Sequence, residues 1–434
     1  MEIVGTSTEQ MKRNYHVSLD IDKLTAYVQE ELKTLHAFCS KCSIYRVPKR
    51  LRDLKDRAFT PQIVSIGPIH HGKEELKEME EHKKIFLQEF LQLSELSVKE
   101  CIAAIAGRET RLRNCFADNF ENISTEDFVK MMLLDSSFII VVFLIRFSSF
   151  TPINYDRIFG KPWMIRGIDF DMCLLENQIP FFILDDLLKL SKRQDECSMI
   201  ELTLHFLSGA FGNSWVPKVI SEQIKSSEVD HFVDLLRKCQ QPAKRKQPQA
   251  LQTRTTPSAM ELHQSGVKLK LGSREKIFDM NFDLYEGILE IPPLYLEDDT
   301  EMLFRNLHAF EECQCRGGYV SDYIATIRNL VRGTNDVEIL AKNGIIDYWL
   351  SDKDAVMSVL RDLDGGNRIS LDNFYYADVV EDLNKYCGKR RYKWIAALKQ
   401  NYFHNPWASI SVVAAGALLI LTVIQTVCSV IQVK

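Results

Sequence analysis

The sequence lacks the short motifs that would assign it to an enzyme class. It contains no P-loop, no glycine-rich dinucleotide motif, no HExxH and no GxSxG. It also lacks a surplus of basic residues, since its formal net charge is -5, and this argues against a nucleic-acid partner for the whole chain. The N-terminal stretch MEIVGTSTEQMKRN has no apolar core, so no secretory signal is predicted there. We therefore expect no enzyme activity and no cofactor.

The cysteine pattern is not that of a disulfide framework. The eleven cysteines are odd in number and scattered, and Cys101, Cys173 and Cys428 lie within apolar helical runs. This pattern favours reduced, buried thiols in a reducing compartment. The hydrophobic fraction of 46% in 434 residues is enough for a sizeable folded core.

Charged residues are absent from 405–433, near the C-terminus, and the run from Ala408 to Ile424 is almost wholly apolar. About 20 helical residues cross a hydrocarbon core of roughly 30 Å, so we predict a transmembrane helix over 406–430. A buried core helix is the alternative, but such a helix usually carries a polar stripe and this one has none. The residues assigned to the anchor are Pro406 in its first turn, Trp407 as an interfacial aromatic, Leu418, Leu421 and Gln425.

The charges beside this segment predict its orientation. The basic residues that precede it are Lys389, Arg390, Arg391, Lys393 and Lys399, whereas only Lys434 follows it. The positive-inside rule places the N-terminal bulk in the cytoplasm, and the late position of the helix predicts insertion after synthesis, as in tail-anchored proteins. The basic and aromatic segment 389–403 could bind an anionic leaflet or merely stop the helix from sliding. Neither the plasma membrane nor the endoplasmic reticulum is favoured.

Apolar periodicity predicts a mainly α fold for the rest of the chain. Residues 1–40 indicate a polar tail and an amphipathic helix, and 41–400 a large helical domain. Within it, 239–258 is rich in Gln, Pro and basic residues, which predicts a mobile linker. Three runs within 267–296 have a strand-like period and predict a small antiparallel β-meander.

Helices are predicted over 73–93, 98–117 and 126–145. Thr125 is the expected N-cap of the third helix, whose apolar part is too short to span a bilayer and should form a buried core helix. Pro180 forbids one continuous helix near 171–190, so we predict a turn at 177–178 and a new helix from Pro180.

Several side chains could belong to a site. His70, His71 and His82 could bind a metal, but adjacent histidines point in different directions, and structural hydrogen bonds are favoured. A zinc site would require the fold to join two cysteine pairs, Cys39 with Cys42 and Cys313 with Cys315. The carboxyl groups of Asp169, Asp171 and Glu176 could serve acid–base chemistry. We favour helix capping by Asp169 or Asp171, and backbone hydrogen bonding by Glu176 and Asn177.

Ordered matches along the chain resemble the plant family named domain of unknown function 247. The matching stretches are Ile44–Pro48, Pro61–His71, Met132–Asp135 with Phe138, Leu174–Phe182, Ala259–His263 with Gly266 and Val267, Gly287–Pro293, Arg305–Glu311, and Trp407 with Leu421–Thr426. The resemblance implies a plant origin and a C-terminal anchor, but no established catalytic activity and no catalytic residues. Some grass members of the family are associated with self-incompatibility, which implies recognition or signalling.

Three functional hypotheses follow. The first is a membrane-anchored interaction protein that binds an unknown protein partner through an exposed apolar patch. The second is an enzyme acting close to the membrane, which requires a deep pocket where His70, His71, Asp169 or Glu176 converge. The third is lipid recognition by segment 389–403.

Overall fold

The structure is a computed structural model of the chain. It describes residues 20–33, 42–148, 158–191, 197–212, 215–217, 224, 227–242, 250–253, 255–314, 318–367, 369–388 and 406–432. The chain forms two units, Met1–Cys42 and Ser43–Lys434. In the first unit, helix α1 (Ile21–Lys33) lies where the amphipathic helix is predicted, and Leu24, Val28 and Leu32 are exposed.

The second unit is mainly helical with small sheets, so the predicted fold class is confirmed at this level. Its N-terminal helices are α2 (Lys49–Arg52), α3 (Lys77–Ser94), α4 (Val98–Ala106), α5 (Glu109–Arg113), α6 (Thr125–Phe147), α8 (Pro162–Asp171), α9 (Phe181–Leu190), α10 (Met199–Phe211) and α12 (Phe232–Cys239). Its C-terminal helices are α13 (Ala259–Gln264), α14 (Asp298–Gln314), α15 (Tyr319–Leu330), α16 (Thr334–Lys342), α17 (Lys353–Asp364), α18 (Ala377–Gly388) and α20 (Pro406–Gln432). Two short 3-10 helices are η1 (Asp56–Phe59) and η2 (Glu74–Leu76).

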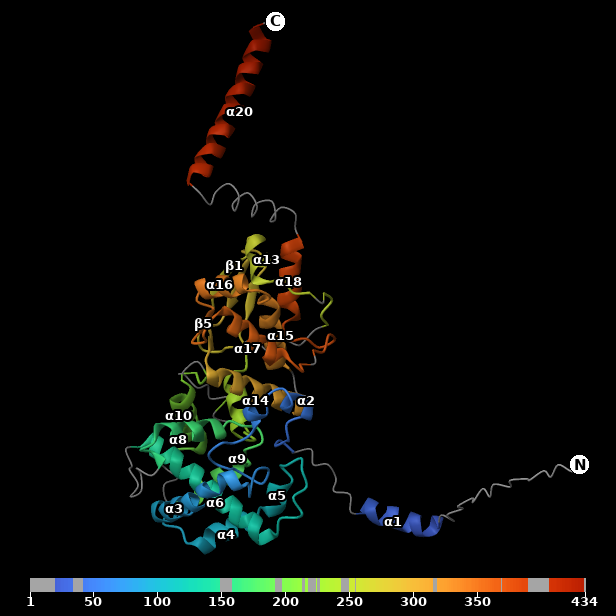
Figure 1. The fold of residues 1–434 in the computed structure, drawn as a ribbon, viewed down its shortest axis with the longest axis vertical. Helices are drawn as coiled ribbons and strands as arrows, with labels where there is room; N and C mark the ends of the chain where they lie inside the picture. Colours follow the sequence, from blue (N-terminus) through green and yellow to red (C-terminus); the bar gives the residue numbers. More distant parts are fainter. Residues whose placement is uncertain are drawn as a thin grey trace, which may run out of the picture. The chain divides into compact units, whose positions relative to one another are not determined.

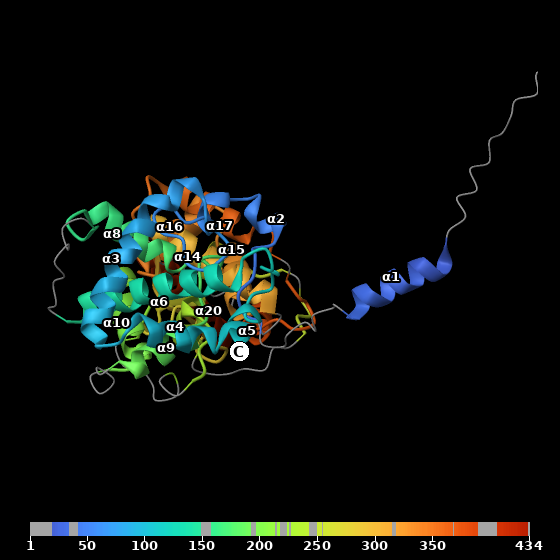
Figure 2. The same cartoon turned by 90° about the horizontal axis from the view of Figure 1, so that it is seen from below.

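Helix α6 is the core of the N-terminal helices. It packs against α3, α4, α9 and α10, which surround it in two perpendicular views (Figures 1 and 2). Among residues whose side chains are described, only α6 is long and apolar enough to cross a membrane by length and composition, and 94% of its apolar stretch is buried inside the protein. In α20 these residues form the shorter apolar stretch Ala414–Thr426. The predicted burial of α6 is therefore confirmed, but the prediction that its apolar part is too short to span a bilayer is wrong. Its N-cap is Ser124 rather than Thr125, because the Ser124 side chain accepts from the Asp127 N–H.

The predicted antiparallel meander is wrong in its strand pairing. Strand β3 (Ile288–Ile291) lies in the middle of a sheet, parallel to β1 (Lys268–Leu271) and antiparallel to β2 (Asn281–Asp283). The alternation of apolar and polar residues along a strand indicates which face is buried but not which strand lies beside it, so the strand order could not be predicted. The third predicted run is also divided, because Pro292 and Pro293 have no N–H to continue the ladder. The chain after them forms β4 (Leu294–Leu296), which pairs in parallel with β5 (Ile346–Tyr348) in a second sheet.

Helix α14 connects the two halves of this unit. It contacts η1 and α12 from the N-terminal half and β4, α15 and α17 from the C-terminal half, and Figure 1 shows it between the two groups. Part of the predicted linker 239–258 is packed here. Gln240 is fully buried and its side chain accepts from the Ile277 N–H, and the Thr253 N–H donates to Glu381. Residues 243–249 of the linker lie outside the described residues.

Helix α20 is a continuous helix of 27 residues. The side chains that the structure describes there are exposed, and they include Leu418, Leu421 and Gln425. The side chains of Pro406 and Trp407 are not described. The predicted basic flank of Lys389, Arg390, Arg391, Lys393 and Lys399 lies outside the described residues.

Candidate functional site

Two segments that are far apart in the sequence form a buried polar core. We call Pro61–Gly67 the extended segment and Asp171–Pro180 the motif turn. Asp171 ends α8, and Pro180 begins α9 by preceding its first residue. The turn before Pro180 is therefore present as predicted. Without a strand partner, both segments must satisfy their backbone groups through side chains, because buried unpaired N–H and C=O groups are costly.

Asp171 holds the start of the extended segment. Its carboxylate accepts from the N–H groups of Gln62, Ile63 and Val64 at 2.9, 2.6 and 2.8 Å. Burial raises the pKa of Asp171 to about 7, although the three N–H groups act in the opposite direction. The predicted helix-capping role is wrong, because the carboxylate bonds to a distant segment rather than to its own helix.

Asn177 and Gln178 complete the junction. The Asn177 side chain accepts from the Ile66 N–H at 2.7 Å and donates to the Val64 carbonyl at 3.0 Å. The Gln178 side chain donates to the carbonyls of Met172, Leu174 and Asn177 in its own turn and accepts from the Phe232 N–H at 3.0 Å. The predicted backbone bonding by Asn177 is confirmed, and both amides act as rigid connectors between main-chain segments.

Glu176 is the centre of a buried charge cluster. One carboxylate oxygen accepts from the Val47 N–H at 2.6 Å, as the backbone-bonding prediction requires. The other forms an ion pair with Arg52 and lies 3.0 Å from His70 Nε2. Burial opposes ionisation of Glu176, but the bonds from His70 and Arg52 outweigh it and hold the carboxyl pKa below its ordinary value. Burial also lowers the pKa of His70, which favours its neutral form.

A second buried ion pair lies at the other end of the extended segment. Lys83 of α3 is fully buried and contacts Asp135 of α6, Glu80 and the Ser65 carbonyl, at 2.5, 2.6 and 2.5 Å. Burial disfavours the ammonium, but the carboxylates of Asp135 and Glu80 hold the pKa of Lys83 above its ordinary value. The sequence contains a signal for this pair. Asp135 is an isolated charge within an apolar helix, and such a charge needs a buried partner.

Asp135 also accepts from the Gly67 N–H at 2.8 Å. Gly67 has φ +72°, and a Cβ there would lie 2.5 Å from the Gln178 carbonyl oxygen. Only glycine allows both this backbone conformation and the close approach of the motif turn. The extended segment is therefore fixed at its two ends, by Asp171 and by Asp135.

The residues proposed for an enzyme site do not converge in a pocket. His70 and Glu176 meet in the packed interior, His71 is exposed, and Asp169 pairs instead with Arg146 at 2.5 Å. Asp171 does line a cavity of about 210 Å³, but its carboxylate is occupied by the three N–H groups of the extended segment. The polar core thus has the geometry of a structural junction.

A serine, a histidine and a glutamate also meet in the C-terminal half. His308 Nδ1 lies 2.8 Å from the Ser321 hydroxyl, which donates to Glu311 at 3.0 Å. Glu311 additionally accepts from the Val320 and Ser321 N–H groups and pairs with Arg237. In a hydrolytic triad the acid orients the histidine, whereas here it bonds to the serine directly. The arrangement is that of a buried cap on α15.

No group of three or more His, Cys, Asp and Glu within the described residues is placed to hold a metal ion. Cys39 and Cys315, which the zinc hypothesis requires, lie outside the described residues. The other two cysteines of the zinc hypothesis, Cys42 and Cys313, are partly buried.

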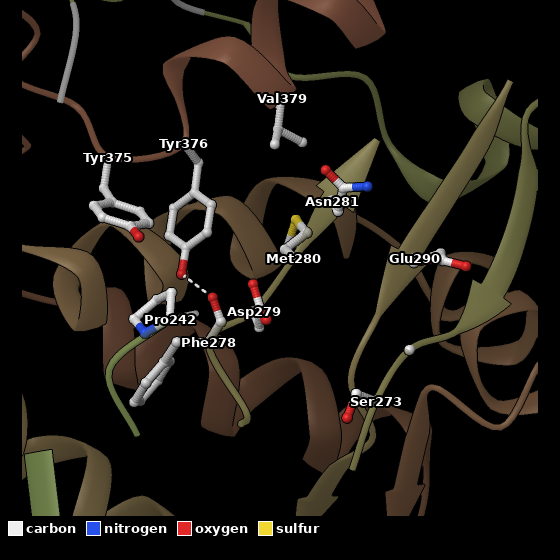
Figure 3. A pocket seen from close by; sticks show the side chains of 11 residues that line it. Pro242, Ser273, Phe278, Asp279, Met280, Asn281, Glu290, Tyr375, Tyr376 and Val379 are labelled. Atoms are coloured by element: carbon white, nitrogen blue, oxygen red, sulfur yellow. Dashed lines mark hydrogen bonds between the residues drawn. The ribbon is translucent and has the colours of Figure 1, made fainter. Parts of the chain in front are cut away.

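A cavity of about 210 Å³ opens beside the three-stranded sheet (Figure 3). Its lining comes from Pro242, from the β1–β2 connection, from β2 and β3, from Tyr375 and Tyr376 just before α18, and from Val379 within α18. Polar groups in the wall include Asp279, Asn281 and Glu290, and aromatic rings are supplied by Tyr375 and Tyr376. Reasoning from the sequence missed this cavity, because its walls are brought together only by the strand order β1-β3-β2.

Comparison with known proteins identifies relatives along most of the chain. UPF0481 protein At3g47200 of Arabidopsis thaliana is 26% identical over 421 residues, covering 90% of this chain and 87% of the relative. The putative UPF0481 protein At3g02645 of the same plant is 24% identical over 481 residues, covering 88% and 89%. No solved structure matches. The sequence profile of DUF247, described as plant protein of unknown function, matches residues 44–421, and the chain therefore belongs to this family.

Proposed function

We propose that the chain is a membrane-anchored protein whose helical domain faces the cytoplasm and binds a protein partner without catalysing a reaction. The observation that carries the anchor is α20, a helix whose described side chains include the exposed Leu418, Leu421 and Ile424. Exposed apolar side chains on a charge-free helix are costly in water and favourable in a hydrocarbon core. Lys389, Arg390 and Arg391 on its N-terminal side support a cytoplasmic domain.

The interaction role is supported by what the family's motif residues do. Glu176 bonds to the Val47 N–H and contacts His70, and Asp169 pairs with Arg146, so the enzyme hypothesis loses three of the four groups it relied on. The second unit also exposes aromatic side chains, with Trp349 84% and Tyr285 95% exposed. Such side chains are enriched among the anchors of protein interfaces, so these positions are the first candidates for partner contacts.

The anchor is tested with two matched double substitutions in the full chain. In plant microsomes, Leu418→Arg with Leu421→Arg adds about 3 kcal/mol of insertion cost per position at the centre of the span. We expect this protein to wash off in alkaline carbonate, whereas wild type and Leu418→Ala with Leu421→Ala remain in the pellet. Retention of the arginine variant, or release of wild type, would contradict the anchor.

Topology and partner binding need separate measurements. Protease added outside sealed microsomes should digest the domain and leave a short membrane-protected C-terminal fragment. Protection of the domain would contradict the cytoplasmic orientation.

Proximity labelling with the full chain should identify a partner protein. This partner should no longer be labelled by the Trp349→Ala or Tyr285→Ala variant, although these variants should associate with the membrane as wild type does. A set of neighbours identical to that of an unrelated tail-anchored protein would contradict the interaction role.

A further inference from the structure

The cavity beside the three-stranded sheet has a preformed aromatic wall. Tyr376 is buried and donates from its hydroxyl to the Phe278 carbonyl at 2.6 Å, which fixes its ring (Figure 3). The Tyr375 ring packs on it, with centroids 5.0 Å apart and planes at 70°. The Tyr375 N–H is in turn held by Asp322 at 2.7 Å. Because the Tyr376 ring is held by its bond to Phe278, and the Tyr375 backbone by Asp322, a ligand would not have to order this wall.

The charged side chains that the structure places in the cavity wall are both acidic. Among the described residues, Asp279 and Glu290 belong to the lining, and no lysine, arginine or histidine does. Two nearby lysines are engaged, since Lys270 pairs with Glu290 at 2.8 Å and Lys276 donates to the Gln241 carbonyl at 2.6 Å. Within the part of the chain that the structure describes, the Asp279 carboxylate is therefore a negative charge without an ion-pair partner beside aromatic rings.

The polar and apolar parts of the wall are arranged around one space. Figure 3 shows Tyr375 and Tyr376 on one side, Asn281 and Glu290 on the other, and Asp279 between them. Val379, which is buried, closes part of the wall from α18. Cations are attracted to the faces of tyrosine rings and to carboxylates, whereas an anion would be repelled by both carboxylates.

The size of the cavity limits the ligand. A dry cavity of about 150 Å³ holds a benzene molecule. At about 210 Å³, this cavity has room for a slightly larger group, of the size of a lysine or arginine side chain.

We propose that this cavity binds a guanidinium or alkylammonium group on a short apolar stem, with Asp279 as its counter-ion and the Tyr375 and Tyr376 rings against its stem. The group can belong to a free organic amine or to a basic side chain of a partner protein, which share this chemistry. If the group is a basic side chain of a partner protein, the cavity is a contact point of the proposed protein interaction, and the inference then rests on that proposed function.

The test uses the full chain in detergent micelles and n-butylguanidinium as the probe, with binding measured by calorimetry or ligand-observed NMR. The matched control ligand is n-butylurea, which has nearly the same shape and no charge. We expect saturable binding of the guanidinium, at a dissociation constant of about 1 mM for so small a ligand, and at least about tenfold weaker binding of the urea. Equal binding of the two, or none of the guanidinium, would overturn the proposal.

Two substitutions locate the binding. Asp279→Asn should weaken the guanidinium about tenfold, and Val379→Phe should remove binding by filling the cavity. The matched control is Glu275→Gln, which changes an exposed carboxylate of the same connection outside the lining and should bind as wild type does. Unchanged binding by Asp279→Asn, with all variants melting as wild type, would overturn the assignment.

The source of the cation is distinguished by a peptide pair, N-acetyl-Gly-Arg-Gly-amide and its uncharged citrulline analogue. Preference for the arginine peptide over n-butylguanidinium supports a partner side chain, and exclusion of the peptide with retention of the small cation supports a free amine. Loss of membrane retention by the wild-type chain would contradict the proposed function alone, because these titrations do not depend on the bilayer.

Discussion

Substitution of Glu176 by Gln tests whether the motif turn is a structural junction. The change preserves the shape of the side chain but replaces one acceptor oxygen by an NH2 donor and removes the charge. Three donors face the carboxylate: the Val47 N–H, Arg52 and His70. With Gln, at least one buried donor is left facing another donor, and Arg52 loses its buried counter-ion.

The magnitude follows from the burial of the partners. Removing one member of a fully buried ion pair costs about 3–5 kcal/mol, and a lost charged hydrogen bond about 1.5–3 kcal/mol. Glu176 and His70 are almost completely buried, but the Arg52 side chain is one quarter exposed and also pairs with Asp56. We therefore expect the lower end of the first range, a loss of about 3 kcal/mol in the free energy of unfolding.

The assay is urea unfolding of the full chain in detergent micelles, followed by far-UV circular dichroism. Glu81→Gln is the matched control, because the exposed Glu81 pairs with an exposed Lys84, and its loss should cost no more than about 0.5 kcal/mol. The pKa of Glu176 is lowered by folding, so its contribution is present at neutral pH and is lost as the pH falls through the folded pKa. The difference between wild type and Glu176→Gln should shrink accordingly. A variant as stable as wild type at pH 7 would refute the structural account.

Four further outcomes are expected. Gly67→Ala should lower the free energy of unfolding by clearly more than the roughly 1–2 kcal/mol that a left-handed alanine costs. Gly72→Ala is the control, because Gly72 has φ +81° and nothing within 4 Å of the added Cβ, so it should cost only that amount. Equal losses in the two variants would contradict the close approach to Gln178. Lys83→Met should cost about 3–5 kcal/mol by leaving Asp135 buried without its cation, and the double variant with Asp135→Asn should recover part of this loss in the same urea titration. Because burial lowers the pKa of His70, the unfolded chain binds more protons than the folded chain below about pH 6.5. The free energy of unfolding should therefore decrease as the pH falls below this value, and it should decrease less in His70→Gln. Burial raises the pKa of the Cys239 thiol to about 12, so iodoacetamide should label Cys239 in urea but not in the native protein, as mass spectrometry of its peptide would show.

Local patterns in the sequence predicted local structure well. The buried helix α6 and the break at Pro180 each follow from nearby residues. They depend on a helical apolar run and on a missing N–H, which act within a few residues. For Glu176 and Asn177 the type of bond was predicted but not its partner, because Val47 and Ile66 lie 129 and 111 residues away in the sequence.

Features that depend on distant contacts could not be predicted in this way. Because β1 pairs in parallel with β3, strand β2 lies on the opposite edge of β3 from β1. The alternation of apolar and polar residues along each strand does not encode this order. Asp171 resembles a helix cap in sequence, yet its carboxylate serves N–H groups about 110 residues earlier. Lys83 resembles an exposed residue of an amphipathic helix, and its burial is decided by Asp135 on a neighbouring helix. The cavity in Figure 3 likewise exists only once strand order is set.

Asn306 of α14 has a consequence for how the protein is made. Its side chain accepts from the Leu175 N–H and donates to the Ala58 carbonyl, both at 2.8 Å, so three remote portions of the polypeptide join at one amide. The junction cannot close until α14 has been synthesised, yet about 100 residues still separate Asn306 from Pro406. At translation speeds of about 5–20 residues per second, the nascent chain has some 5–20 s to assemble before its last helix is complete. If α20 is the membrane anchor proposed above, the machinery that inserts it would then meet a chain whose N-terminal half has already folded.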